Sequence, residues 1–255
     1  MFLDNYPCTS SEFACSRILR GLSSAPAILL IHGFMGSPYD LQWIGTQLND
    51  AGYTVYIPRL PGHGTNAKDF QANSYKDWIR CVFHVYIDIS AKHEQVFVAG
   101  HSMGGLLASL LAARFNPEKL LLFAPAFSFT DKRIALSPIA KLFCKRITVN
   151  ESSFYQEPAF LTAMKDYIGV RYLAQVADFY TLQKLTKKNI AYIKAETFIV
   201  LSHKDRSVPF SVKNFLDERL KTVKKYLILE ESSHQVTDDV ERETVAKKTI
   251  EFLKL

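Results

Sequence analysis

The stretch Gly100-His101-Ser102-Met103-Gly104-Gly105 follows the apolar run Val96-Phe97-Val98-Ala99 and precedes a helix-forming run at residues 106–113. An apolar run of β-branched and aromatic residues, a serine between glycines and a helix-forming run predict a strand, a sharp turn and a helix. In so tight a turn, side chains at positions 100 and 104 would collide with the neighbouring strand or helix, which explains the glycines. We therefore expect a nucleophile elbow that holds the Ser102 hydroxyl out at the carboxyl end of a sheet.

The helix that follows Ser102 strengthens this interpretation. Its unpaired N–H groups and the positive end of its dipole face the serine oxygen. The alternative is that the pattern G-x-S-x-G serves packing alone, because small residues are common at strand-to-helix turns. Other parts of the sequence are needed to choose between a catalytic turn and a turn that serves packing.

Length and composition favour one domain. The chain has 255 residues, 48% of them hydrophobic, and no obvious linker, so residues 1–255 are expected to form a single α/β domain with a large core. The formal net charge is +6, and the lysines are scattered along the chain. Solvated helix faces explain this charge better than an acidic partner or an anionic lipid, and we do not expect nucleic-acid binding.

The cysteines and the start of the chain bear on the cellular compartment. Cys8, Cys15, Cys81 and Cys144 show no C-x-x-C spacing and no neighbouring histidine cluster, so we expect free thiols and no metal site. The first residues lack the basic region of a signal peptide, and no apolar stretch approaches the roughly 20 residues that cross a bilayer. We expect a cytoplasmic protein.

Buried strands alternate with helices over most of the chain. Continuous apolar runs bounded by glycine, proline or polar residues are typical of parallel strands that are covered on both faces. Ser37 and Pro38 predict the start of a helix, and Ser74 predicts the start of another whose buried stripe includes Trp78. The runs that predict strands are 27–31, 53–57, 96–99, 120–123, 197–202 and 226–229.

The alternation stops between residues 126 and 190. Because this stretch follows a strand whose end faces the expected site, we interpret it as an inserted cap or lid. Some of its rings are expected to line a substrate pocket, and a transient contact of the cap with a lipid surface is compatible with its composition. The aromatic residues of the stretch include Phe127, Phe129, Phe143, Phe154, Tyr155, Phe160, Tyr167, Tyr172, Phe179 and Tyr180.

The loop His32-Gly33-Phe34-Met35-Gly36 joins the strand at 27–31 to the helix opened by Ser37. A glycine before Phe34 lets the backbone turn so that an amide N–H faces a pocket. We expect the Phe34 N–H and the Met103 N–H to form an oxyanion hole, since Met103 follows the serine of the elbow. The Phe34 ring is expected to be a wall of the substrate pocket, and His32 to brace the loop by hydrogen bonds.

Ser102, Asp205 and His234 occur in the order nucleophile, acid and histidine, each in a loop after an expected parallel strand. Such loops open on the same edge of a sheet. A serine hydroxyl needs an imidazole to take its proton and a carboxylate to orient that imidazole. We expect these three residues to form a catalytic triad, with His203 as the second choice of base. Taken alone, Asp205 is equally consistent with an ordinary turn aspartate.

These motifs resemble those of the α/β-hydrolase family, and more closely its branch of small bacterial carboxylesterases and monoacylglycerol lipases. The resemblance implies a mostly parallel eight-stranded sheet with helices on both faces, a helical cap after the sixth strand and no required cofactor. This chain differs in having Ser202 and Ser233 where many relatives have glycine. The matching segments are His32-Gly33-Phe34, Pro61-Gly62-His63-Gly64, the elbow, Asp205 with Val208-Pro209, and Ser233-His234.

The sequence therefore favours a serine carboxylic-ester hydrolase that acts on small esters of apolar acids through an acyl-serine intermediate. A thioesterase or acyltransferase could use the same three residues. A non-catalytic binding protein on the same fold is the alternative from a different class.

Overall fold

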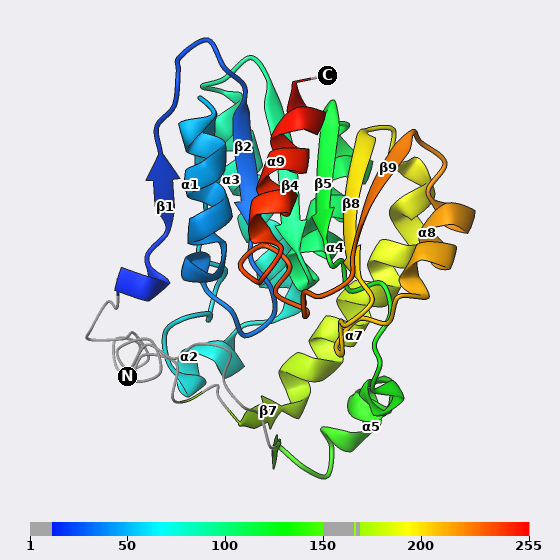
Figure 1. Ribbon diagram of the computed structural model, residues 1–255. Helices are drawn as coiled ribbons and strands as arrows, with labels where there is room; N and C mark the ends of the chain where they lie inside the picture. Colours follow the sequence, from blue (N-terminus) through cyan, green and yellow to red (C-terminus); the bar gives the residue numbers. More distant parts are fainter. Residues whose placement is uncertain (1–11, 150–165, 167–168, 255) are drawn as a thin grey trace.

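The computed structural model describes residues 12–149, 166 and 169–254. Within these residues the main sheet has seven strands in the order β1-β3-β2-β4-β5-β8-β9, and every neighbouring pair is parallel except β1 with β3 (Figure 1). The strands are β1 (Arg17–Leu19), β2 (Ala27–Ile31), β3 (Thr54–Ile57), β4 (Val96–His101), β5 (Lys119–Phe123), β8 (Glu196–Ser202) and β9 (Lys224–Leu229).

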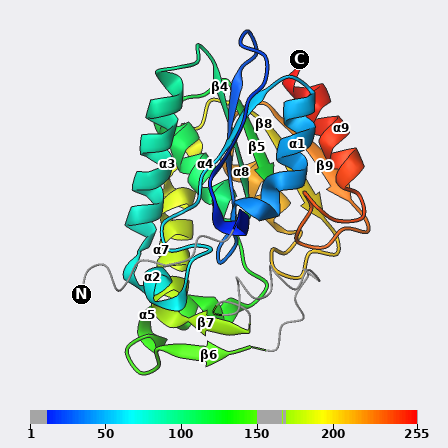
Figure 2. The same cartoon turned by 90° about the vertical axis from the view of Figure 1, so that its left-hand side faces the viewer.

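Helices cover both faces of the sheet, as expected (Figure 2). Side chains of α3, α4 and α8 share one buried cluster, and those of α1 and α9 share another. Alternate strand residues supply the two clusters: Leu29 and Val98 belong to the first, Ile28 and Phe97 to the second. The helices are α1 (Gln42–Asp50), α2 (Ala67–Ala72), α3 (Tyr75–Ser90), α4 (Met103–Phe115), α8 (Val212–Arg219) and α9 (Arg242–Leu253).

Two helix starts can be compared with the local sequence signals that predict them. Ser37 forms a capping box with Asp40 at the 3-10 turn that leads into α1, as its position predicted. The pair Val208-Pro209 predicts a helix start there, but α8 begins at Val212. The amides of Val212 and Lys213 donate to the carbonyls three residues back, at Pro209 and Phe210, so the chain forms a turn before the α-helix begins.

Two details implied by the resemblance differ from the structure. The described residues supply seven strands to the main sheet where eight were expected. The insertion follows β5, which is the fifth of these strands along the chain and not the sixth. The mostly parallel architecture is unchanged, so the corrections concern the count and not the arrangement.

The insertion between β5 and β8 contains short elements followed by one long helix. The short elements lie beyond the carboxyl ends of the parallel strands, and β6 and β7 pair as an antiparallel ribbon (Figures 1 and 2). The elements are a 3-10 helix (Lys132–Leu136), α5 (Ser137–Ala140), β6 (Arg146–Thr148), β7 (Val170–Tyr172), α7 (Leu173–Asn189) and a second 3-10 turn (Ile190–Tyr192).

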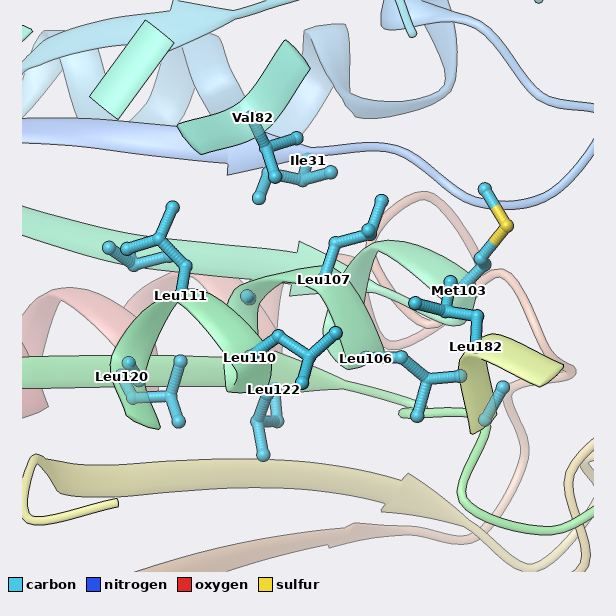
Figure 3. Close-up of a cluster of buried hydrophobic side chains, with 14 of the residues drawn as sticks. Ile31, Val82, Met103, Leu106, Leu107, Leu110, Leu111, Leu120, Leu122 and Leu182 are labelled. Atoms are coloured by element: carbon cyan, nitrogen blue, oxygen red, sulfur yellow. The ribbon is translucent and has the colours of Figure 1, made fainter. Parts of the chain in front are cut away.

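Helix α7 is fastened to the rest of the fold by buried amides. Gln183 Nε2 donates to the Ala126 carbonyl at 2.8 Å, and Gln175 Nε2 donates to the carbonyls of Gln71 at 3.1 Å and Asn73 at 3.3 Å. Leu182 lies fully buried between them, in the same cluster as the side chains of α4 (Figure 3). The inner face of α7 is thus held near its start and near its middle.

None of the helices in the described part of the chain is long and apolar enough to span a membrane. Cys81 and Cys144 are free thiols, as expected, while Cys8 lies outside the described residues.

The start of α4 presses directly against the sheet. A Cβ at Gly104 would lie 2.0 Å from the Ile31 carbonyl oxygen, and a Cβ at Gly100 would lie 2.1 Å from the Gly104 carbonyl oxygen. At Gly105 the nearest atom is Pro125 Cβ at 2.9 Å, which belongs to a loop. The collisions expected at positions 100 and 104 are therefore present, and they are with backbone atoms that cannot rotate away.

We predict that Gly104→Ala lowers the free energy of unfolding by on the order of 2 kcal/mol or more, although alanine is the better helix former. Gly105→Ala is the matched control in the same helical turn and should cost less than half as much. Urea unfolding of both variants measures the difference. Equal stabilities for the two would contradict the close contact at Gly104.

Candidate active site

The candidate site lies where the strand order reverses. The chain passes from β2 to β3 on one side of β2 and then to β4 on its other side, and Ile31 of β2 pairs with Gly100 of β4. Such a switch point leaves a crevice at the carboxyl ends of parallel strands. The loops after β2 and β4 carry Phe34 and Ser102, so the topology brings them together.

Ser102 adopts the backbone conformation of a sharp turn, with φ of 54° and ψ of −115°. A positive φ is unfavourable for a residue with a Cβ, and the surrounding hydrogen bonds hold it there. The Ser102 N–H donates to the Phe123 carbonyl at 2.9 Å, while its carbonyl accepts from Gly105 N at 3.0 Å and Ala126 N at 3.1 Å. The residue is 6% exposed.

Ser102, His234 and Asp205 form one chain of hydrogen bonds. Ser102 Oγ lies 2.9 Å from His234 Nε2, and His234 Nδ1 lies 2.7 Å from Asp205 Oδ2. Because Nδ1 faces a carboxylate, it carries the proton, and Nε2 is left to accept from the serine hydroxyl. The structure therefore brings together the three side chains that the sequence singled out.

Asp205 is held as a carboxylate. Burial alone would raise its pKa, but the hydrogen bond from His234 and those from the Val208 and Ser207 amides hold the pKa below its usual value. Those two amides donate to Oδ1 at 2.9 Å and 2.8 Å, which leaves Oδ2 for His234. The geometry fixes the orientation and the tautomer of the imidazole.

His203, the second choice of base, takes a different position. Its Nε2 lies 3.8 Å from Glu230 Oε1, and its ring packs against the ring of Phe210 with centroids 4.0 Å apart. The histidine that hydrogen-bonds to Ser102 is His234.

Of the two amides expected to form an oxyanion hole, that of Met103 lies at a helix start and that of Phe34 in the loop after β2. Met103 is the first residue of α4, so its N–H has no acceptor within the helix. Gly33 passes so close to the serine that a Cβ there would lie 3.3 Å from Ser102 Cβ. Phe34 and Met35 form the turn that follows, with Met35 at a φ of 59°. The loop after β2 thus reaches the serine, as expected.

The Phe34 ring belongs to a group of rings between the body and the insertion. It stacks on Phe179 of α7 with centroids 4.9 Å apart, and it lies 5.6 Å from Phe70 and 5.9 Å from Trp78. Phe129 lies edge-on to Phe179, with centroids 4.9 Å apart. The three rings around Phe34 give the side chain beside the expected oxyanion loop an apolar setting.

The aromatic residues of the insertion divide into two groups. Phe129, Tyr172 and Phe179 are buried against the body, whereas Phe143 is 86% exposed. The expectation that some rings face the site therefore falls on Phe179, and it does not extend to Phe143. Phe154, Tyr155, Phe160 and Tyr167 lie outside the described residues.

One contact that sequence reasoning missed links the elbow to the histidine loop. His101 Nε2 donates to the His234 carbonyl at 2.9 Å, and the two rings lie 4.9 Å apart. The residue before the serine thereby fixes the backbone of the residue whose ring binds that serine. Its place in the elbow was visible in the sequence, but its partner is 133 residues away.

Two carboxylates that the sequence did not single out hold the loop before His234. Glu241 Oε2 accepts from the Glu231 amide at 3.0 Å, the Ser232 amide at 2.8 Å and the Ser232 hydroxyl at 2.8 Å. Asp239 Oδ2 accepts from the Ser233 amide at 2.7 Å and also from its hydroxyl. The serines at 232 and 233 are therefore what tie this loop to the residues before α9.

Three histidines near the site are buried and uncharged. Burial lowers the pKa of His32 to about 4, and burial together with the neighbouring His234 lowers the pKa of His101 to about 3. Burial, and the repulsion that a protonated His32 would exert, lower the pKa of His63 well below its ordinary value. His32 and His63 brace their loops as expected: His32 Nε2 accepts from the Leu60 amide, and His63 Nδ1 donates to the Pro61 carbonyl.

These buried histidines predict acid sensitivity. A histidine whose folded pKa is depressed takes up its proton more readily when unfolded, so its contribution is complete above about pH 6.5 and falls as the pH drops towards 4. Each such group should remove about 1.4 kcal/mol of unfolding free energy per pH unit within that window. Asp205 has a lowered pKa, so its stabilising contribution is lost only below about pH 4.

The measurement is urea unfolding at several values between pH 7 and pH 4.5. His63→Asn keeps a donor near the Nδ1 position and should flatten the dependence by about 1 kcal/mol per pH unit. His84→Asn, at an exposed histidine of α3, should leave it unchanged. A slope that is the same in both variants would contradict the assignment.

Comparisons with known proteins identify the family. A family model described as serine aminopeptidase, S33, matches residues 23–241. The thermostable monoacylglycerol lipase of Bacillus sp. (strain H-257) is 27% identical over 227 residues, which cover 88% of this chain and 89% of that protein. The carboxylesterase of Bacillus subtilis (strain 168) is 25% identical over 241 residues, covering 89% and 92% of the two chains.

Solved structures establish the fold. A structure described with the metagenome-derived lipolytic enzymes LipS and LipT superposes with a TM-score of 0.85 at 22% identity, covering 96% of this chain and 99% of that one. It has the α/β-hydrolase fold expected from the sequence motifs. The chain therefore belongs to the serine aminopeptidase, S33, family of α/β-hydrolases and is a hydrolase of the esterase and lipase type.

Proposed function

We propose that this chain is a serine carboxylic-ester hydrolase of the carboxylesterase or monoacylglycerol lipase type, acting on esters of apolar acids. The observation that carries the proposal is the hydrogen-bonded chain from Ser102 Oγ through His234 to Asp205. The names of the two bacterial relatives support the substrate class.

In the proposed first step, Ser102 Oγ attacks the ester carbonyl carbon while its proton passes to His234 Nε2. Asp205 orients the imidazole and stabilises the imidazolium that forms. The Phe34 and Met103 amides donate to the developing oxyanion, and the dipole of α4 adds to its stabilisation. The tetrahedral intermediate then collapses, His234 gives the proton to the departing alcohol, and an acyl-serine remains.

The second step repeats the first with water. Water loses a proton to His234 Nε2 as its oxygen attacks the acyl carbon, and collapse of the second intermediate returns the proton to Ser102 Oγ and releases the acid. No metal or cofactor is needed for either step.

The preference for an apolar acyl group is argued from the rings around Phe34. Phe179, Phe70 and Trp78 lie within 6 Å of it, centroid to centroid, and none of these side chains carries a charge. We propose that Phe34 is a wall of the acyl site and that residues 126–190 cover it as a lid, with Phe179 of α7 as its inner surface.

A thioesterase or an acyltransferase would use the same residues and differ only in the leaving group or the acceptor. A non-catalytic binding protein would have no need of the Ser102 to His234 hydrogen bond. Labelling by a fluorophosphonate separates the binder from the enzymes, since only an activated serine reacts.

We predict that Ser102→Ala and His234→Ala each lower kcat/KM for p-nitrophenyl butyrate by at least about 10⁴-fold and abolish fluorophosphonate labelling at Ser102. The matched controls are Ser109→Ala, at a buried serine of α4, and His203→Ala. Both controls should retain activity within about threefold. Near-native ester hydrolysis by either triad variant would contradict the assignment.

A substrate series tests the reaction class. Monoacylglycerols and p-nitrophenyl esters of increasing chain length should be hydrolysed, with medium chains preferred to acetate, because longer acyl groups bury more apolar area. An acyl thioester and an aminoacyl p-nitroanilide complete the series. Faster turnover of the thioester would favour the thioesterase, and faster turnover of the anilide would favour a peptidase.

The carboxylate of Glu241 gives a separate prediction. If it positions His234 through the loop at 230–233, Glu241→Ala should lower kcat about tenfold with little change in KM, because small displacements of a catalytic group are costly. Glu241→Gln keeps an acceptor for Ser232 and should recover part of the loss. Glu243→Ala, at an exposed residue in the first turn of α9, is the control. Equal kcat values for the two alanine variants would rule out a positioning role.

A further inference from the structure

One surface of the insertion combines exposed apolar side chains with positive charge. Apolar surface of this extent is usually buried, so its exposure needs an explanation. The exposed fractions are 62% at Leu136, 64% at Ile139, 74% at Leu142, 86% at Phe143 and 44% at Ile147. We call this set, with the basic residues among it, the basic apolar surface.

The charge on this surface is mainly positive, although Asp178 of α7 lies close enough to Lys141 to interact with its charge. Residues 132–148 contain five basic residues and no acidic one. Asp131, just before them, is engaged in an ion pair with Arg133 at 2.8 Å. In the described part of the chain, no carboxylate forms an ion pair with Lys141 or Lys145. The five residues are Lys132, Arg133, Lys141, Lys145 and Arg146.

The positive charge continues onto α7. A groove of about 390 Å³ lies between α5 and α7, and its lining includes Pro138, Tyr180, Lys184 and Lys188. The two lysines are one helical turn apart on the same face of α7, and Lys184 Nζ lies 5.6 Å from the centre of the Tyr180 ring. Apolar and basic side chains therefore line this groove together.

The position of the surface relates it to the candidate site. α5 and β6 lie at the end of the molecule beyond the carboxyl ends of the parallel strands, which is the end that bears Ser102 (Figures 1 and 2). A planar surface in contact with α5 and β6 would therefore lie against the end of the fold that bears Ser102.

We propose that the basic apolar surface docks on an anionic lipid membrane. Phe143, Leu142 and the neighbouring aliphatic side chains enter the boundary between headgroups and acyl chains, and the basic residues bind the lipid phosphates. A second copy of this chain fits the surface less well, because it would bring two sets of like charges together. The proposal goes beyond ester hydrolysis and does not depend on it.

Vesicle binding by the full chain tests the proposal. The chain carries Ser102→Ala so that no lipid is consumed, and it is sedimented with vesicles of phosphatidylcholine with or without phosphatidylglycerol. We expect at least about tenfold stronger binding when phosphatidylglycerol is present, and weakening by salt. Absence of binding, or equal binding to pure phosphatidylcholine, would overturn the proposal.

A pair of matched variants locates the contact. Lys141→Glu with Phe143→Glu should lower binding to the phosphatidylglycerol vesicles at least about tenfold. Lys221→Glu with Val223→Glu changes the net charge equally and has the same spacing, and both residues are exposed at the amino end of β9, the opposite edge of the sheet. This control should change binding less than about twofold. Equal losses in the two variants would overturn the proposal.

Folding and self-association are checked on the same proteins. With Ser102 restored, both double variants should hydrolyse p-nitrophenyl butyrate at the unmodified rate and keep its urea midpoint, so that a loss of binding is not a loss of structure. A dimer in solution that Lys141→Glu with Phe143→Glu dissociates would assign the surface to a second copy and overturn the proposal. Vesicle binding by a chain that proves inactive on all esters would leave this proposal standing while removing the proposed function.

Discussion

The contact between the start of α4 and strand β2 is the constraint on which the rest of the structure depends. The space between Gly104 and the Ile31 carbonyl admits no side chain, so the helix begins directly against the sheet. The chain can enter that helix only through a residue with positive φ, and this residue is Ser102. The strain at one serine and the absence of side chains at its glycine neighbours are thus two results of one close approach.

The same approach aligns three separate parts of the chain. Because β2 and β4 are paired up to Ile31 and Gly100, the loop through Gly33 is carried over the serine and the first amide of α4 is left unpaired beside it. His234 lies in the loop after β9. The hydrogen bond from His101 Nε2 to the His234 carbonyl ties this loop to the elbow. The backbone that carries the serine and the backbone that carries the imidazole are therefore joined directly. Movements of the outer loops then change the distance between Ser102 and His234 little.

The fold and the central residues could be predicted because their signals are local. The elbow, the loop after β2 and the alternation of buried strands are each encoded within about ten residues, and convergence of Ser102, Asp205 and His234 follows from the rule that parallel strands end on one edge. The strand count and the place of the insertion were carried over from a resemblance, and both differ in the described residues. The start of α8 lies three residues after Pro209, because the chain first makes a turn with hydrogen bonds from Val212 N to Pro209 O and from Lys213 N to Phe210 O.

Other features could not be predicted because they join distant residues or depend on which way a ring faces. Glu241 binds the backbone amides of a loop about ten residues away, and nothing in the sequence around it distinguishes this glutamate from Glu243. Phe179 and Phe143 belong to the same aromatic stretch, yet one stacks on Phe34 and the other is largely exposed. The hydrophobic pattern of a stretch does not tell which of its apolar side chains will find another side chain to pack against.

The amide bonds of Gln175 and Gln183 have a consequence for how this protein can diverge. Swinging α7 outward would break these hydrogen bonds near its start and its middle and exchange them for bonds to water, at a net cost of about 0.5–1.5 kcal/mol for each bond. The position of Phe179 against Phe34 is therefore fixed by the same contacts that hold α7 to the fold, and we expect it to be kept as the protein diverges. The described residues 131–149 have few such ties to the body of the fold and can accept insertions, deletions and exchanges between homologous proteins, so new ligand preferences can arise there without disturbing the chemistry beneath.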